Sequence, residues 1–290
     1  MKLSGKISKF FDIFKQIFSR NQETKFKVKS FDIIGSREKA VAIIEVPENF
    51  KGDVGEIASE ILKRHKNVKS VLRKVSERKG KYRLREYELV LGSNNTEVVH
   101  KEYGCLFKLD PRKVYFSPRE ATERQRIASQ VKAGETVMVM FSGIAPYPIQ
   151  ILKKQPKVKK VIAVEINPDA VKYAIENIKL NKIEEGKIVP ILGDVKEICP
   201  RFYGLCDRVV MPLPLGAEDY LDIAIRCLKK EGGIIHFYNW GKEEDPYTNA
   251  INLISKATKK LDRNYEILNE RKVLPYAPRV YKICIDFKVF

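Results

Sequence analysis

The sequence predicts a doubly wound α/β domain preceded by a smaller α+β domain. The chain has 290 residues, which is enough for one large domain and one smaller one. Beyond residue 113, uncharged apolar runs alternate with amphipathic stretches, as in a parallel sheet covered by helices. Before that point, short alternating segments are separated by Gly, Ser and Asn. We therefore divide the chain into residues 1–24, 25–112 and 113–290.

The first segment, residues 1–24, is predicted to form a basic amphipathic helix followed by a linker. Lysines separate apolar residues that recur at helical spacing. These apolar residues are Ile7, Phe10, Phe11, Phe14, Ile17 and Phe18. Such a helix can lie on a membrane surface, but we expect it to dock on its own domain or on a partner. The polar run at 20–25 is typical of a linker.

Residues 25–112 are predicted to form a compact α+β domain. The apolar run at 40–46 is typical of a strand and ends at Pro47. Residues 53–65 begin with Asp53, a favourable N-cap, and continue with helical periodicity. The remaining predicted strands are 70–75, 85–91 and 97–103.

The charge balance is the most informative part of the composition. Fifty-five Lys and Arg against 37 Asp and Glu give a net charge of +18. This surplus favours a polyanionic partner such as nucleic acid, because each neutralised phosphate releases condensed counterions. Residues 63–85 are especially rich in Lys and Arg, interleaved with Val and Leu. A solvated basic surface is the plainer interpretation of that run, but we expect one positively charged sheet face that follows phosphates.

The cysteines and the apolar runs exclude several classes of protein. Five scattered cysteines without a CxxC pattern indicate a reducing cytoplasm and argue against both a disulfide frame and a zinc site. The sequence has no apolar run long enough to span a membrane, and its N-terminus lacks the apolar core of a signal peptide. We expect a cytoplasmic protein that uses no metal, does not bind membranes and acts as a monomer.

The larger domain, residues 113–290, is predicted to be a parallel sheet with helices on both faces. The predicted elements are strands 136–141, 159–166, 187–194, 207–214 and 234–240 and helices 167–182 and 216–233. In such sheets the ligand crevice lies outside the carboxyl ends of the strands. The residues that follow each strand are therefore the candidates for a binding site.

The first two strand ends indicate a nucleoside site. Ser142, Gly143 and Ala145 follow the first strand and allow close backbone approach. Comparable nucleotide-binding turns usually carry an acidic residue at the position of Val139 and a second glycine at that of Ala145. Glu165 ends the second strand 22 residues beyond Gly143, the spacing of an acid that binds a ribose diol. Alternatively, Glu165 is only an acid favoured by the N-terminus of the next helix.

The next two strand ends extend the same crevice. The third strand ends in Gly193-Asp194, and this carboxylate suits the exocyclic amine of adenine or serves only as a helix cap. The rigid segment 211–214 follows the fourth strand. The chain has neither GxGxxG nor a P-loop, so a pyrophosphate ligand is disfavoured. An adenosine ligand without a phosphate chain fits better, and we expect S-adenosylmethionine.

Several segments together resemble the archaeal-type tRNA (guanine-37-N1) methyltransferases. They are FSPREATERQRIASQV (116–131), AVEINPDAVKYAIENIKLN (163–181), ILGD (191–194), DRVVMPLP (207–214) and YAPRVYKICIDF (276–287). The resemblance extends over roughly residues 30–290. It implies a Rossmann-like class I methyltransferase domain preceded by a small RNA-contacting domain. It also implies a tRNA substrate, methylated at N1 of the guanosine just 3′ of the anticodon.

The resemblance implies a general base and a catalytic cation. Guanine N1 carries a proton with a pKa of about 9, so a base must remove it, and a cation near O6 would stabilise the developing charge. The family's base corresponds to Glu123, whose plainer interpretation is a helix ion pair with Arg126. The family's catalytic arginine corresponds to Arg83, with Arg85 as an open alternative.

Further site residues follow from the same resemblance. Tyr115, Arg119, Pro212 and Pro214 are expected to line the pocket of the target base. The residues expected to bind the cofactor are Phe141, Ser142, Gly143, Ala145, Glu165, Ile166, Asn167, Asp194, Val195 and Met211.

The chain departs from the family pattern at three positions. The family has an acidic residue at Val139, a glycine at Ala145 and an asparagine at Pro212. The first two are expected to contact the methionine and sugar end of the cofactor, and the third the target base. Uncompensated loss of a charged contact would cost about 1.5–3 kcal/mol of binding free energy. The pattern fits a diverged member of the family.

Three functions remain open at this point. We expect a methyltransferase that acts on guanosine 37 of tRNA or on a wyosine-type derivative of that base. The related aminocarboxypropyl transferases use another carbon of the same cofactor, but the SPR and ATER segments argue against that activity. A tRNA-binding protein that has lost catalysis is the third possibility, and the altered turn at Val139 and Ala145 supports it.

Overall fold

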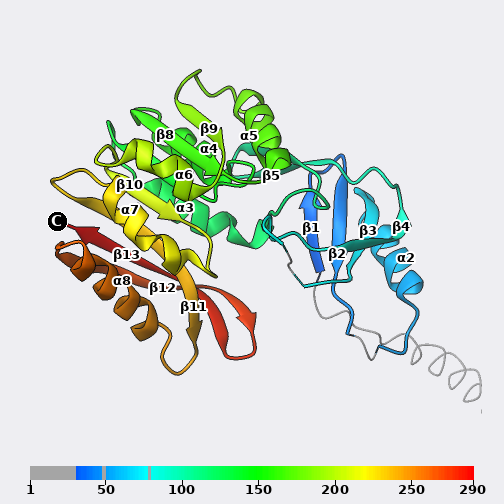
Figure 1. Ribbon diagram of the computed structural model, residues 1–290. Coiled ribbons are helices and arrows are strands. Elements are labelled where there is room, and N and C mark those ends of the chain that lie inside the picture. Colours follow the sequence, from blue (N-terminus) through cyan, green and yellow to red (C-terminus); the bar gives the residue numbers. More distant parts are fainter. Residues whose placement is uncertain (1–30, 48–49, 78–79) are drawn as a thin grey trace, which may run out of the picture.

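The computed structural model describes residues 31–47, 50–77 and 80–290. The helix and linker predicted at 1–24 lie outside these residues. Figure 1 shows a small module, coloured blue to cyan, beside a larger one, coloured green to red. Among the described residues, no helix has the length and apolar character needed to cross a membrane.

The small module is a four-stranded sheet with a helix against it. Its strands lie in the order β1-β2-β3-β4, with β2 and β3 parallel and the outer pairs antiparallel. The elements are β1 (Phe31–Gly35), β2 (Ala40–Ile44), α2 (Val54–Arg64), β3 (Val68–Lys74) and β4 (Tyr87–Gly92). Helix α2 begins after Asp53, whose Oδ1 accepts from the Gly55 N–H at 2.7 Å, as the sequence predicts. Strand β1 was not predicted.

In the part of the basic run that the structure describes, β3 does not present one positively charged sheet face. Val71 and Leu72 in the middle of β3 have no exposed surface, because β3 is an inner strand. The cations at its end are paired with acids, Arg73 with Glu88 at 2.6 Å and Lys74 with Glu45 at 2.7 Å. The prediction was wrong on this point. Alternation along a strand does not reveal that both faces are covered.

A hairpin, β5 (Val98–Glu102) and β6 (Cys105–Leu109), joins the two modules. The Asn181 side chain pairs with the backbone of Leu106, at 2.9 and 2.6 Å. The Asn177 side chain does the same with Lys108, at 2.6 and 3.1 Å. Toward the small module, the Gly35 N–H donates to His100 Nδ1 at 3.2 Å. The hairpin lies within the predicted residues 25–112, yet its hydrogen bonds tie it to the larger module as well.

The larger module contains a seven-stranded sheet in the order β12-β13-β11-β10-β7-β8-β9. Strands β9, β8, β7, β10 and β11 are parallel, whereas β13 is antiparallel to β11 and to β12. The strands are β7 (Thr136–Met140), β8 (Lys160–Glu165), β9 (Ile188–Leu192), β10 (Arg208–Met211), β11 (Gly233–Lys242), β12 (Tyr265–Ala277) and β13 (Val280–Val289). This confirms the predicted doubly wound fold.

Helices cover the faces of this sheet (Figure 1). They are α3 (Ala121–Gln130), α4 (Pro146–Lys154), α5 (Pro168–Leu180), α6 (Val195–Ile198), α7 (Leu221–Cys227) and α8 (Thr248–Lys260), with 3-10 turns η1 (Pro118–Glu120), η2 (Cys199–Phe202) and η3 (Ala217–Tyr220). The helix predicted at 216–233 is shorter than expected. It starts as η3 and ends at Cys227, because Leu228 has extended backbone angles.

Candidate active site

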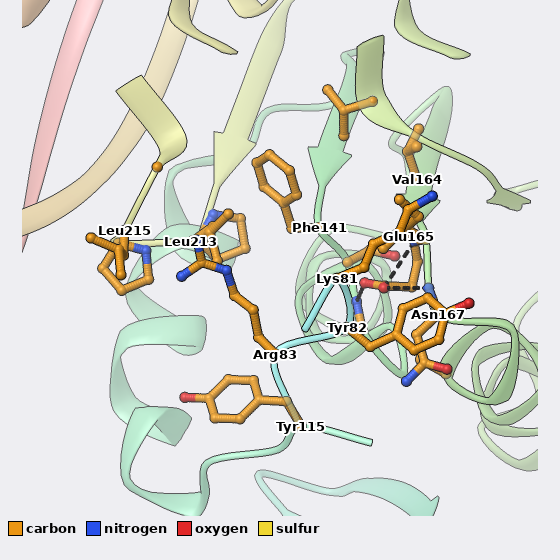
Figure 2. A pocket seen from close by; sticks show the side chains of 18 of the residues that line it. Lys81, Tyr82, Arg83, Tyr115, Phe141, Val164, Glu165, Asn167, Leu213 and Leu215 are labelled. Carbon is orange, nitrogen blue, oxygen red and sulfur yellow. Dashed lines mark hydrogen bonds between the residues drawn. The ribbon is translucent and has the colours of Figure 1, made fainter. Parts of the chain in front are cut away.

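A cavity of about 520 Å³ lies at the carboxyl edge of the parallel strands and includes residues of both modules. Figure 2 shows Lys81, Tyr82 and Arg83 of the small module together with Phe141 and Glu165 of the larger one. The volume is typical of a site for a small molecule or cofactor. The predicted crevice is therefore present, and the small module completes its wall.

Most of the predicted site residues meet in this cavity. Those that line it are Arg83, Tyr115, Phe141, Ser142, Gly143, Glu165, Ile166, Asn167, Asp194, Val195, Pro212 and Pro214. Four others, Arg119, Glu123, Ala145 and Met211, are not among its described lining residues. Ala145 and Met211 have no exposed surface and lie behind the wall. Arg119 instead pairs with Asp32 of the small module at 2.5 Å and is half exposed.

Glu165 is held by backbone groups at the end of β8. Its Oε2 accepts from the Gly143 N–H at 2.7 Å, and its Oε1 accepts from Ile166 and Asn167 at 2.9 and 2.8 Å (Figure 2). Burial raises the pKa of Glu165, although these three N–H groups favour the charged form. Each carboxylate oxygen can accept two hydrogen bonds, so Oε2 keeps capacity for a ribose hydroxyl. The Glu165 carboxylate thus accepts hydrogen bonds from the backbone of the neighbouring turns and can still bind a diol.

The turn after β7 uses left-handed backbone at three positions. The φ angles are 53° at Phe141, 56° at Gly143 and 66° at Ala145. Ala145 is the residue before α4, and its N–H donates to the Ser142 carbonyl at 3.1 Å. A left-handed alanine costs about 1–2 kcal/mol because its Cβ crowds the following carbonyl. This geometry explains why a glycine is usual at that position.

We expect Ala145→Gly to raise the free energy of unfolding by about 1 kcal/mol, since glycine removes the Cβ strain but adds freedom to the unfolded chain. Urea denaturation measures this change. Ala121→Gly is the matched control, because Ala121 has a φ of −55° and should lose about 1 kcal/mol instead. Equal destabilisation by both substitutions would show that residue 145 bears no strain.

Val139 does not contribute to the cavity. It has no exposed surface and packs in the apolar core with Tyr147 and Tyr238. The expectation that an acid here would contact the cofactor is wrong for this structure, because the Val139 side chain faces the core. Its substitution therefore gives no support to a loss of cofactor binding.

Asp194 has its predicted role as a helix cap, and its predicted contact with the adenine amine stays a prediction. It is the N-cap of α6, and its Oδ1 accepts from the Lys196 N–H at 2.8 Å. It also lines the cavity next to Gly193 and Val195. Opposite the turn, the segment 212–216 forms a wall that Leu213 and Leu215 extend (Figure 2).

The structure distinguishes Arg83 from Arg85. Arg83 has a φ of 50° and lines the cavity. Its Nη2 lies against Gly216, 3.3 Å from where a Cβ there would stand. Arg85 is outside the described lining, and its guanidinium lies 3.5 Å from Glu77. Of these two arginines, Arg83 is therefore the one available for chemistry in the cavity.

Glu123 lies in a buried network beside the cavity. Its side chain is 3% exposed and accepts from Arg126 Nη2 and Nε at 2.7 and 2.9 Å. Arg271 Nε lies 3.2 Å away, and the Tyr238 hydroxyl donates to Oε1 at 2.6 Å. The predicted alternative, an ion pair with Arg126, is therefore present. Direct contact between Glu123 and a base in the cavity is not part of this geometry.

Glu120 is a carboxylate of the cavity lining that lies one helical turn before Glu123. Its Oε1 accepts from the Tyr115 hydroxyl at 3.1 Å, and its Oε2 lies 2.8 Å from Lys282 Nζ. Burial alone would raise the pKa of Glu120, but the charges of Lys282 and Arg124 outweigh it and hold the pKa below its usual value. Sequence reasoning missed Glu120, because its partner Lys282 is 162 residues away.

Two aromatic residues at the cavity were also missed. Trp240 and Tyr276 stack with ring centroids 4.0 Å apart and planes tilted by 33°. Tyr276 is 55% exposed, and both residues belong to the cavity lining. The resemblance included Tyr276 in a matching segment, but no pattern linked it to Trp240 on a different strand.

One cluster in the described residues has metal-ligand chemistry. His236, Cys284 and Asp286 place their potential ligand atoms within 4.8 Å of one another. Arg208 Nη1 lies 2.8 Å from His236 Nε2, and Arg126 pairs with Asp286. Two guanidinium groups at these atoms would repel a cation, so the cluster is better described as a buried hydrogen-bond network.

Family models and similar sequences point to the same family of methyltransferases. Residues 98–268 match the TRM5/TYW2 methyltransferase domain, and residues 12–96 match the TYW2 N-terminal domain. The tRNA (guanine(37)-N(1))-methyltransferase Trm5b of Pyrococcus abyssi is 45% identical over 95% of this chain and 80% of its own length. The tRNA 4-demethylwyosine(37)-methyltransferase Taw21 of Saccharolobus solfataricus is 38% identical over 82% of this chain and 89% of its own.

Solved structures agree with these matches. The crystal structure of Trm5b from P. abyssi has a TM-score of 0.81 and covers 91% of this chain and 76% of its own. P. horikoshii TYW2 in complex with MeSAdo has a TM-score of 0.77, is 30% identical, and covers 95% and 97%. The fold, the strand-end site and these matches agree, and the chain belongs to the TRM5/TYW2 methyltransferase family.

Proposed function

We propose that this protein transfers a methyl group from S-adenosylmethionine to N1 of guanosine 37 in tRNA, or to a wyosine-type derivative of that base. The observation that carries the proposal is the cavity at the strand ends. It unites the carboxylates of Glu165 and Asp194 with Arg83 from the small module. These groups would supply a cofactor end and a base end within one cavity.

The cofactor end fits an adenosine ligand. Glu165 binds the ribose diol through the capacity left on its Oε2, and Asp194 accepts from the adenine amine. The turn 141–143 approaches the ligand through its backbone, and a Cβ at Gly143 would meet only the Tyr115 carbonyl, at 3.9 Å. When bound, S-adenosylmethionine supplies the activated methyl group on its sulfonium. The solved structure of Methanocaldococcus jannaschii TYW2 contains AdoMet.

The base end holds groups suited to a guanine. Pro212 and Pro214 contribute an apolar wall, and Tyr115 belongs to the same lining. The guanidinium of Arg83 lies beside Gly216, where it stabilises negative charge that develops on O6. Glu123 is the acceptor of the N1 proton, by the likeness to the family.

A tRNA partner agrees with the charge of the chain. The net charge of +18 favours binding to phosphates. The relative named aTrm5 was solved with tRNALeu, and it covers 95% of this chain with a TM-score of 0.78. At the cavity, the stacked Trp240 and the exposed Tyr276 offer a surface on which an unpaired base can stack.

We expect Tyr276→Ala to raise the Kd for tRNA about 5- to 150-fold, since stacking contributes about 1–3 kcal/mol per base. Filter binding measures the Kd, and calorimetry should show cofactor affinity within about twofold of the original. Tyr103→Ala is the control, because Tyr103 is 57% exposed but lies outside the cavity lining. Similar Kd values for the two variants would remove Tyr276 from the RNA surface.

The relatives and the structure bear on each of the alternative functions. A tRNA(Phe) aminocarboxypropyltransferase of M. jannaschii is 36% identical over 79% of this chain, so that chemistry is close in sequence. The 4-demethylwyosine methyltransferase relative, together with Pro212 in place of asparagine, favours a modified base as a second methyl acceptor. The case for a non-catalytic binder loses one of its two supports, because Val139 lies in the core.

The deciding experiment uses two labels in the cofactor. S-adenosylmethionine labelled in its methyl group, or separately in its carboxyl group, is incubated with tRNA transcripts that carry guanosine or adenosine at position 37. Guanosine-dependent methyl label supports the proposal, whereas carboxyl label in the RNA indicates aminocarboxypropyl transfer. If neither label enters, tRNA carrying 4-demethylwyosine is tested next, and failure there too would overturn the proposal.

A further inference from the structure

Two tyrosines connect the cavity with Glu123. Tyr147, at the start of α4, lines the cavity, and its hydroxyl donates to the Tyr238 hydroxyl at 3.2 Å. Tyr238, on β11, has no exposed surface and donates to Glu123 Oε1 at 2.6 Å. Tyr147 donates to Tyr238 and Tyr238 donates to Glu123, so both hydrogen bonds run toward the carboxylate. The chain of hydroxyls therefore leads from a residue of the cavity lining to the predicted base.

We propose that Tyr147 and Tyr238 relay the N1 proton of the target base from the cavity to Glu123. The inference rests on the proposed methyl transfer to guanosine and deepens it. It explains how Glu123 can accept the proton of a base in the cavity although Glu123 is outside the described lining. In this scheme Tyr147 is a catalytic residue, and Tyr238 is the link that reaches the carboxylate.

The relay conserves atoms and electrons. N1 gives its proton to the Tyr147 oxygen while Tyr147 passes its own proton to Tyr238. Tyr238 in turn passes its proton to Glu123, which becomes a neutral carboxylic acid. The electron pair of the N1–H bond forms the new N1–C bond to the methyl group, and the pair of the C–S bond stays on sulfur. Both tyrosines end as neutral phenols.

The surroundings keep these hydroxyls neutral. Burial, with the charges of Glu120 and Glu123, raises the pKa of Tyr147 well above its usual value. Burial does the same for Tyr238, with Cys284 on β13 as a further cause. A neutral phenol can donate and accept at once, as a relay requires.

Charged groups from every neighbouring element face the relay. On α3, Arg124 acts on Tyr147, and Arg126 pairs with Glu123 at 2.7 Å. Arg271 of β12 lies 3.2 Å from Glu123, and Lys282 Nζ of β13 stands 4.8 Å from the Tyr238 ring centroid. Of these cations, Arg126 and Arg271 contact Glu123 directly and favour its carboxylate form.

The test is the pH dependence of single-turnover methyl transfer by Tyr147→Phe and Tyr238→Phe with a guanosine-37 transcript. At pH 7 we expect a rate loss of about 10²-fold. In solution N1 loses its proton near a pKa of about 9, so the deficit should shrink about tenfold per pH unit up to that value. A structural defect would leave the ratio of rates independent of pH. A constant ratio, or no loss at pH 7, overturns the relay.

Tyr173→Phe is the matched control. Tyr173 is buried and donates to Glu97 Oε2 at 2.7 Å, but it lies outside the cavity lining. Its removal deletes the same kind of tyrosine–glutamate bond and should leave the rate within about twofold. Tm, cofactor affinity and tRNA affinity are measured for all three variants, so that a folding defect is recognised.

A second measurement uses the unaltered protein. Several protons move together in a relay, so the rate plotted against the deuterium fraction of the solvent should be curved. A straight line or no isotope effect would overturn the relay even if the variants do not fold. Absence of methyl transfer to every guanosine-37 substrate by the unaltered protein would instead refute methyl transfer to guanosine, and the relay with it.

Discussion

Replacing Glu123 with glutamine is expected to lower the single-turnover rate of methyl transfer at pH 7 by about 10²- to 10⁴-fold. The amide keeps the shape of the side chain and can still accept from Tyr238, but it cannot take up a proton. Rapid quench with methyl-labelled cofactor and a guanosine-37 transcript measures the rate. Affinity for tRNA should remain within about threefold, because Glu123 is buried beside the cavity.

Glu120→Gln is the informative comparison for this experiment. Glu120 lines the cavity directly and pairs with Lys282 at 2.8 Å. If the proton left through a carboxylate in the cavity itself, Glu120→Gln would have the larger effect on rate. A larger loss for Glu120→Gln than for Glu123→Gln would transfer the role of base to Glu120 and end the argument for Glu123.

Arg83→Ala is expected to reduce kcat by about 10²- to 10³-fold, as removal of a single donor to a developing oxyanion does. The KM for S-adenosylmethionine should change little, since the guanidinium lies beside Gly216 in the segment after β10 and not among the partners of Glu165. Steady-state kinetics with saturating tRNA separate the two constants. Arg83→Lys should recover part of the loss, because it restores a cation without the planar fork.

Arg85→Ala is the control for the neighbouring position. Its guanidinium lies 3.5 Å from Glu77, and the residue is outside the cavity lining. We expect its kcat to stay within about threefold of the original. Comparable losses for both arginines would mean that the loop as a whole, and not one guanidinium, is required.

The fold and the cofactor end of the site could be predicted from sequence because their signals are local. Apolar runs mark the buried strands, and the residues after each run, such as Glu165 and Asp194, must meet at one edge of a parallel sheet. Helix caps are equally local, as Asp53 and Asn167 show. Such features depend on residues within one turn or one strand.

The chemistry of the base end could be predicted only in part, since it depends on contacts between distant segments. Glu120 meets Lys282, and Tyr147 meets Tyr238, across 162 and 91 residues. No pattern within a single element announces such pairs. The burial of the Val139 side chain in the core was also missed, because its position in a strand does not reveal which face of a covered sheet it packs on.

The hairpin β5–β6 determines how parts of such proteins can be recombined. Asn177 and Asn181 bond its backbone to the larger module, while the loop that carries Arg83 precedes the hairpin in the chain. A chimera joined at residue 112 would import a foreign hairpin and mismatch those asparagines. A junction near residue 96 would exchange the small module together with Arg83 and leave the asparagine contacts native, so exchange of substrate preference between relatives is best attempted there.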